Sequence, residues 1–185
     1  MRSIESFLIV ILSTIIISAQ NNSYIPLNIK PAYEKGTRSM DGTPGSNYWQ
    51  NKSEYNIKAN IDPRTKKLSG SEEIVYYNNS PDSLNQIVVR LYQNVNRPDA
   101  RRDFYINPKA INDGVKLKKI SVENSERQID DKSLVNITGT NLTLKLTEKL
   151  APNSKINLSF DWEMEIPPVS SIRFGSYDST SMFIA

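Results

Sequence analysis

The chain has 185 residues and a formal net charge of +3, and it contains neither histidine nor cysteine. Without histidine the chain lacks the commonest metal ligand and the commonest general base. Without cysteine it lacks the most reactive nucleophile and any disulfide. These two absences exclude most enzyme chemistries. A charge this small also argues against a nucleic-acid partner.

Residues 1–19 have the order of a secretory signal peptide. Arg2 lies in a short polar start, residues 7–19 read FLIVILSTIIISA, and polar residues follow Ala19. The apolar run is shorter than the roughly 20 residues that cross a bilayer, so a cleaved signal is favoured over an anchor. We therefore predict no transmembrane span in the mature chain. We also predict an exported protein that is periplasmic, on the cell surface or secreted.

Residues 20–47 are rich in Asn, Pro, Gly, Ser and charged residues, and they show no sustained hydrophobic period. Gly42, Pro44 and Gly45 are turn formers within this stretch. We predict a flexible linker or arm here, ahead of a single domain over residues 48–185.

The next segment alternates between apolar and polar residues. Tyr55, Ile57, Ala59 and Ile61 occupy every second position, which predicts a strand with one face in the core and one in water. Residues 72–77 read EEIVYY and are apolar on both faces towards their end. That pattern is typical of a central strand, and we expect it to pair back as a hairpin.

A turn cluster, NNSPDS at residues 78–83, leads into the remaining strand candidates. A long irregular loop at residues 94–113 interrupts them, and loops of this length usually have a function. No stretch is long and amphipathic enough for a helix. Short strands between turns predict an all-β fold, either an antiparallel β-sandwich or a saddle-like open sheet. The further strands are expected at residues 87–92, 115–122, 134–137, 142–146 and 156–166.

The strand expected at residues 156–166 has an acidic face formed by Ser159, Asp161, Glu163 and Glu165. Neighbouring carboxylates on this face lie about 6.6 Å apart at a rise of about 3.3 Å per residue, a separation that a glycosidase pair can use. Acids on one face of an antiparallel strand more often face water, however, so we assign no catalytic role to them.

Lysines at positions 116, 118 and 119 are the nearest feature to a basic patch. They alternate with apolar residues, as the wet face of a strand does. The doubled Lys118 and Lys119 break that alternation, which predicts a β-bulge at this point.

Other catalytic and metal-binding patterns are missing. No serine is followed three residues later by lysine, the arrangement that replaces histidine in some hydrolases. Asp130 and Asp131 lack the alternating oxygens and the glycine of a calcium loop. We therefore predict no catalytic, cofactor-binding or metal-binding residue in this chain.

Four segments, in order along the chain, resemble a known family. They read DGTPGSNYWQNKSEYNIKA, SGSEEIVYYNNSPDSL, LYQNVNRPDARR and LAPNSKINLSFDW, at residues 41–59, 69–84, 91–102 and 150–162. Together they resemble the amino-terminal β domain of bacterial aminopeptidases of the M1 zinc metallopeptidase family, in the version found in exported Bacteroidetes-type proteins. The resemblance covers nearly all of residues 41–185.

The resemblance implies a β domain that packs on a thermolysin-like catalytic domain and helps enclose the site around the free amine of a peptide substrate. In the family, that catalytic domain holds zinc through HExxH and a more distant glutamate. Because those residues are absent here, zinc is implied only for a catalytic domain outside this sequence. Near the end of the chain, the resemblance places Tyr177, Asp178 and Phe183 close to a domain interface.

The apolar end SMFIA also favours the front portion of a longer protein. A domain cut from its partner is expected to show an uncovered apolar patch, an unpaired strand edge and a tendency to associate or to be only marginally stable.

Two other classes of function stay open. A free-standing secreted β-sandwich that binds a protein or glycan would expose clustered aromatic side chains, although core packing is the expected use of most of them. A cofactor-free hydrolase would use the acidic strand at residues 156–166. The aromatic candidates are Tyr48, Trp49, Tyr55, Tyr92 and Tyr105.

Overall fold

The structure is a computed structural model that describes residues 24–171 and 173–184. The predicted signal peptide at residues 1–19 lies outside the described residues. The chain forms two compact units, the first ending at Trp49 and the second beginning at Gln50. In the described part of the chain, no helix has both the length and the apolar character needed to cross a membrane.

The first unit contains the short helix α2 (Lys30–Glu34), which has a proline in its first turn. A bridge between Arg38 and Pro44 closes a turn, inside which the Asp41 carboxylate accepts hydrogen bonds from the backbone and hydroxyl of Thr43. Residues 24–47, expected to be an irregular arm, thus have local structure. A helix of five residues is too short to produce a recognisable hydrophobic period.

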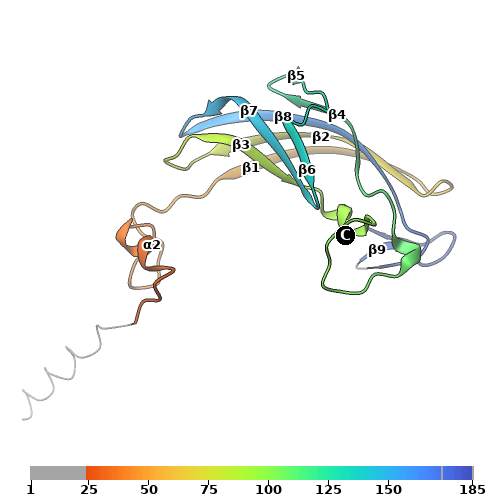
Figure 1. The fold of residues 1–185 in the computed structure, drawn as a ribbon, viewed down its shortest axis with the longest axis horizontal. Coiled ribbons are helices and arrows are strands. Elements are labelled where there is room, and N and C mark those ends of the chain that lie inside the picture. The colour runs from red at the N-terminus through yellow and green to blue at the C-terminus, as the bar shows by residue number, and fades with distance from the viewer. Residues whose placement is uncertain (1–23, 172, 185) are drawn as a thin grey trace, which may run out of the picture. The chain divides into compact units, whose positions relative to one another are not determined.

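The second unit is built on a five-stranded antiparallel sheet (Figure 1). Strands β1 (Lys52–Asp62) and β2 (Lys67–Asn78) form the predicted hairpin and pair from Lys52 opposite Tyr77 to Asp62 opposite Lys67 without a register shift. Strand β2 lies inside the sheet, between β1 and β8, as expected of a central strand. In spatial order the strands are β1 (Lys52–Asp62), β2 (Lys67–Asn78), β8 (Ser154–Glu165), β4 (Lys116–Val122) and β5 (Ser125–Glu126).

A smaller sheet of three strands, β3 (Leu84–Arg90), β7 (Asn141–Leu150) and β6 (Val135–Thr138), packs on one face of the five-stranded sheet. Leu142 and Leu144 of the small sheet are fully buried in one cluster with Ile120 and Phe160 of the large sheet. The predicted all-β, sandwich-like fold is confirmed. A separate pair, β9 (Phe174–Ser176) and β10 (Met182–Ile184), lies near the end of the chain.

Two details of the predicted strands are confirmed. Leu158 and Phe160 on β8 are buried, whereas Asp161 and Glu165 on the opposite face are exposed. The pairing of β4 with β8 shifts register between Leu117 and Lys119, where a bulge was expected.

The expectation for β1 is wrong. Its apolar residues Tyr55, Ile57 and Ile61 are 60%, 54% and 42% exposed, and no β1 side chain belongs to the core cluster. The alternation correctly predicts the strand, but β1 is the outermost strand of the sheet and its apolar face is left in water.

Candidate functional site

One polar corner of the second unit is organised by Asn78, at the end of β2. Its side chain is fully buried, and its amide donates to the carbonyl oxygens of Asp82 at 2.8 Å, Leu150 at 3.2 Å and Ala151 at 3.0 Å. Its Oδ1 accepts from the backbone and the hydroxyl of Ser80, at 3.2 and 2.6 Å. This network, which we call the Asn78 corner, joins the turn after β2 to the end of β7.

The segment that leads into β1 joins the same corner. Asn51 donates to the hydroxyl of Tyr76 at 2.6 Å, and its Oδ1 accepts from the backbone of Asn79 at 2.9 Å. The side chain of Asn79 in turn donates to the backbone oxygen of Gln50 at 2.9 Å. Three of the four segments that carry the family resemblance therefore meet here, through hydrogen bonds that fix the backbone.

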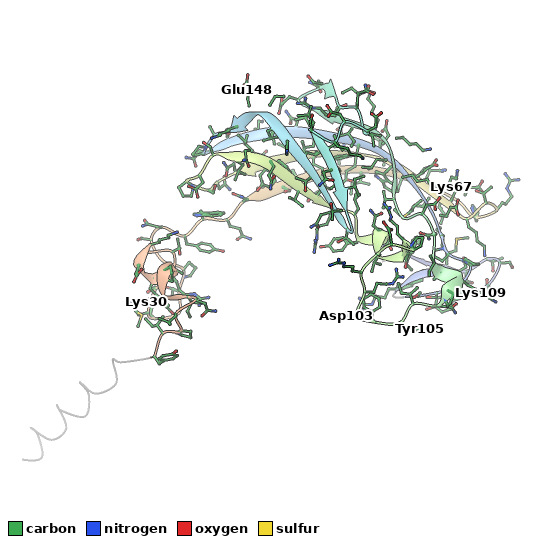
Figure 2. The ribbon with its side chains drawn as sticks, in the orientation of Figure 1. Lys30, Lys67, Asp103, Tyr105, Lys109 and Glu148 are labelled. Atoms are coloured by element: carbon green, nitrogen blue, oxygen red, sulfur yellow. The ribbon has the colours of Figure 1, made fainter. Side chains whose placement is uncertain are left out.

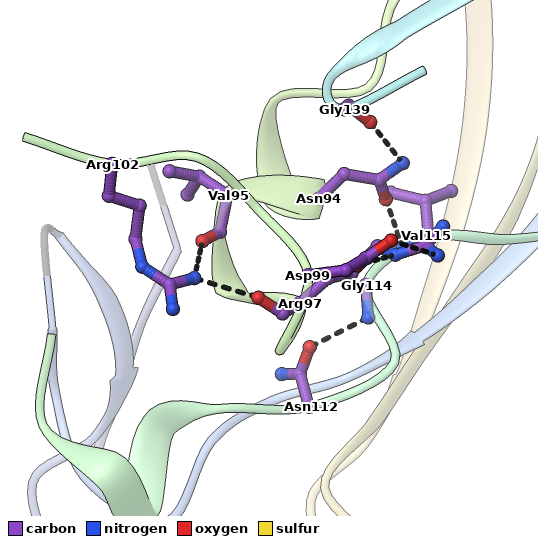
Figure 3. Close-up of polar contacts among 9 residues, drawn as sticks. All are labelled: Asn94, Val95, Arg97, Asp99, Arg102, Asn112, Gly114, Val115 and Gly139. Carbon is purple, nitrogen blue, oxygen red and sulfur yellow. Dashed lines mark hydrogen bonds and ion pairs between the residues drawn. The ribbon is translucent and has the colours of Figure 1, made fainter. Parts of the chain in front are cut away.

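A second network holds the long loop between β3 and β4, which includes the short 3₁₀ helices η2 (Tyr92–Asn96) and η3 (Pro108–Ala110). Asn94 is 1% exposed, donates to the carbonyl of Gly139 at 3.2 Å, and accepts from the backbone of Val115 at 2.9 Å (Figure 3). We call this the Asn94 corner. Glycine at position 114 leaves room for the Asn94 side chain, because a Cβ on this residue would lie 2.5 Å from the Asn94 oxygen.

Side chains in the rest of this loop make hydrogen bonds to backbone groups and form an ion pair. Arg102 donates to the carbonyls of Val95 and Arg97, each at 2.7 Å, while the side chain of Arg97 pairs with Asp99 (Figure 3). The amide of Asn112 donates to the backbone oxygen of Glu165 at 3.2 Å, which links the loop to the end of β8. The segment LYQNVNRPDARR thus forms an ordered structure in which Asn94, Arg97 and Arg102 make internal hydrogen bonds, while the buried Oδ1 of Asn96 has no partner among the described residues.

Aromatic side chains project from the same loop. Tyr92, Phe104 and Tyr105 are 70%, 46% and 81% exposed, and Figure 2 places Tyr105 near Asp103 on the outside of the loop. All five aromatic candidates from the sequence are exposed, so the expectation that most would pack in the core is wrong. They belong to different elements, however: Tyr48 and Trp49 to the first unit, Tyr55 to β1, and Tyr92 and Tyr105 to the loop.

The acidic face of β8 has the electrostatics of a structural surface. Glu163 lies 2.9 Å from the ammonium of Lys118 and 3.7 Å from that of Lys67. The hydrogen bond from Lys118 lowers the pKa of the Glu163 carboxyl. A general acid needs the opposite shift, so Glu163 is not suited to act as the acid in glycoside hydrolysis.

At the end of the chain, Asp178 organises a turn by accepting from the backbone and hydroxyl of Thr180 and from the backbone of Ser181. These hydrogen bonds, led by the one from the Thr180 backbone, lower the pKa of Asp178 to about 2. Tyr177 is 71% exposed and Phe183 42%. Their expected position near a domain interface stays a prediction.

The residues of this chain do not fit the zinc that the resemblance implies for a neighbouring domain. A catalytic zinc takes three protein ligands, drawn from histidine, cysteine and carboxylates. The chain has neither of the first two, and within residues 24–171 and 173–184 no three acidic side chains gather closely enough to hold a metal ion.

No family model and no curated protein sequence matches the chain. Among solved structures, an M1 zinc metallopeptidase from Deinococcus radiodurans is 13% identical, with a TM-score of 0.41 over 60% of this chain and 20% of that chain. A mutant of the M1 zinc metallopeptidase from the same organism, bound to a Tyr-Ser-Ala substrate, is 13% identical with a TM-score of 0.43, over 70% and 24% of the two chains. This chain therefore spans about a fifth to a quarter of the length of these proteins.

Proposed function

We propose that this chain is the amino-terminal, non-catalytic β domain of an exported M1-like zinc aminopeptidase of the Bacteroidetes type. In this proposal it packs on a catalytic domain encoded further along the same gene. Its role is to support that domain and to help enclose the peptide site, while zinc and the reacting groups belong to the catalytic domain.

One observation carries the proposal. The four segments that resemble the family have structural roles, and three of them meet in the Asn78 corner. The fourth builds the Asn94 corner and is held by buried amides and backbone carbonyls. Motif residues used in this way specify a scaffold, because hydrogen bonds within the fold occupy the polar atoms that a catalytic site would offer to a substrate.

The electrostatics of the described carboxyl groups agree with a supporting role. Most of the shifted carboxyl pKa values are lowered, by hydrogen bonds or by nearby lysines, as for Asp41, Asp178 and Glu163. The exception is Glu72, whose pKa burial raises. It lies on β2 opposite Ile57 and Phe160, and burial alone accounts for the direction of its shift.

The proposal is tested by comparing two products of the gene in one assay. The 185-residue chain should bind no stoichiometric zinc and should not hydrolyse aminoacyl p-nitroanilides. The longer product of the natural reading frame should hydrolyse them with zinc, and N-acetylated substrates should be left intact because they lack the free amine. Zinc-dependent turnover by the 185-residue chain alone would contradict the proposal.

A second candidate function, a free-standing binding module, is favoured by the exposed aromatics Tyr92, Phe104 and Tyr105 on the ordered loop. Exposed aromatic rings on a fixed backbone are suited to stacking on a sugar or packing on a protein. A glycan-array signal that the double substitution Tyr92→Ala and Tyr105→Ala abolishes would support this candidate. Absence of any signal would leave the scaffold role as the better account.

A further inference from the structure

The edge formed by β1 lacks three of the features that usually protect a sheet edge, namely short length, proline and a bulge, although it carries Lys52 and Lys58. In the described part of the chain, β1 pairs with β2 alone, along all 11 of its residues. The pairing has no bulge, and the sequence KSEYNIKANID contains no proline. Natural proteins commonly blunt edges with short strands, prolines or bulges, because a long regular edge offers unpaired backbone groups to another strand.

The apolar side of this edge continues a sheet face that is partly buried and that carries Glu72 opposite Ile57. Tyr55 lies opposite Ile74, Ile61 lies opposite Leu68, and β8 extends the row with Leu158 and Met164. The core cluster covers Ile74 and Leu158, whereas Tyr55 and Ile61 remain largely exposed. The apolar surface therefore extends from the core to the free edge, and another strand added there would cover it.

We propose that β1 pairs antiparallel with β1 of a second copy of this chain, forming a two-fold dimer centred on Ile57. The two large sheets then become one continuous sheet. The apolar stripes of the two copies lie side by side, with Ile57 opposite the same residue of the other copy and Tyr55 opposite Ala59.

Charge and the extent of strand pairing together select this register. With Ile57 on the axis, all 11 residues of each strand pair, and Lys52 of each copy lies opposite Asp62 of the other. A shift of two residues in one direction puts Lys58 opposite Lys58 and Glu54 opposite Asp62, and like charges directly opposite one another are destabilising. A two-residue shift in the other direction puts Glu54 opposite Lys58, but it leaves Ile61 and Asp62 beyond the β1 of the other copy and so loses two paired residues at each end. A register shift by an odd number of residues places the apolar side chains of one β1 strand beside the polar, solvent-facing side chains of the other.

The dimer is tested by sedimentation equilibrium on the 185-residue chain over a range of concentrations. Wild type should show a reversible monomer–dimer equilibrium. Ile57→Lys and Ile57→Glu should each weaken dimerisation at least ten-fold, because like charges then meet on the axis, whereas mixing the two variants should restore a heterodimer. Val88→Lys, on β3, is the matched control because Val88 is similarly exposed, and it should dimerise like wild type.

A cysteine scan gives an independent readout, since the natural chain has no cysteine. Directly opposite residues have Cβ atoms about 4.5–5.5 Å apart, near the span of a disulfide. Ile57→Cys should therefore crosslink under mild oxidation, whereas Val88→Cys should not. A monomeric wild type, association unaffected by both charged Ile57 variants, failure of the mixed variants to pair, or equal crosslinking of the two cysteine variants would each overturn the proposal. None of these results bears on whether a catalytic domain follows in the gene.

Discussion

The side-chain amide of Asn78 donates a 3.2 Å hydrogen bond to the carbonyl oxygen of Leu150, 72 residues further along the chain. This contact ties the β2 turn of the large sheet to the last residue of β7 in the small sheet. This hydrogen bond is buried, so the Leu150 carbonyl has limited access to replacement water. Asn78 therefore adds a polar link at this corner to the hydrophobic cluster that joins the two sheets.

Replacing Asn78 with alanine should lower the free energy of unfolding by roughly 2–3 kcal/mol, because the buried carbonyl of Leu150 and two partly buried carbonyls lose their donor. Denaturant unfolding followed by circular dichroism measures the loss. Asn56→Ala is the matched control, since Asn56 makes an exposed side-chain hydrogen bond to Glu73 at 3.2 Å. It should change the stability by less than about 0.5 kcal/mol. Equal losses in the two variants would contradict the role given to Asn78.

Gly114→Ala and Gly139→Ala form a matched pair at the Asn94 corner. Both glycines have positive φ, 70° and 56°, so each alanine has a strained backbone at a cost of about 1–2 kcal/mol. Only at Gly114 does the added Cβ meet Asn94, whereas at Gly139 no atom of the described residues lies within 4 Å of it. We expect Gly114→Ala to cost roughly 1–3 kcal/mol more, because it displaces the buried amide. Thermal unfolding of both variants would measure the difference, and equal costs would contradict this account of the corner.

Glu72→Gln should stabilise the domain at neutral pH. Burial raises the pKa of Glu72 in the folded state, so the folded chain binds this proton more readily than the unfolded chain. Stability therefore falls as pH rises from below the unfolded pKa through the folded pKa. The glutamine variant should have a higher melting temperature at pH 7, and the advantage should shrink as pH falls and the wild-type carboxyl becomes protonated.

Glu163→Gln should behave in the opposite way. Lys118 lowers the pKa of Glu163 in the folded state, so this carboxylate contributes stability above its unfolded pKa, and that contribution is lost as pH falls through the folded pKa. The variant should melt below wild type at pH 7, with a difference that narrows in acid and in high salt. Melting curves from pH 2 to 8 for Glu72→Gln and Glu163→Gln would check both expectations. If both variants changed the melting temperature in the same direction at pH 7, the direction of one of the two pKa shifts would be contradicted.

The sequence predicts the features that depend on local periodicity. The two faces of β8 follow from strict alternation, and the bulge on β4 follows from the doubled Lys118 and Lys119. The exposure of Ile57 could not be predicted in this way, because alternation marks an apolar face without saying whether the smaller sheet extends far enough to cover it.

The two polar corners were missed for a related reason. The acceptors of Asn78 and Asn94 include the backbone carbonyls of Leu150 and Gly139, and a carbonyl at a distant position leaves no mark in composition or spacing. The turn cluster NNSPDS was a usable local signal, since asparagine that bonds to the backbone two residues on is typical of turns. The long loop was correctly singled out as unusual, although its 3₁₀ helices and internal hydrogen bonds were not foreseen.

The central claim, that this chain is the supporting domain of a zinc aminopeptidase, is tested most directly by sequencing the coding DNA and transcript immediately beyond codon 185. The account predicts an open frame that continues into a domain with HExxH and a downstream glutamate as the zinc ligands. A stop codon at that position in both DNA and transcript would contradict the claim and would favour a free-standing binding module.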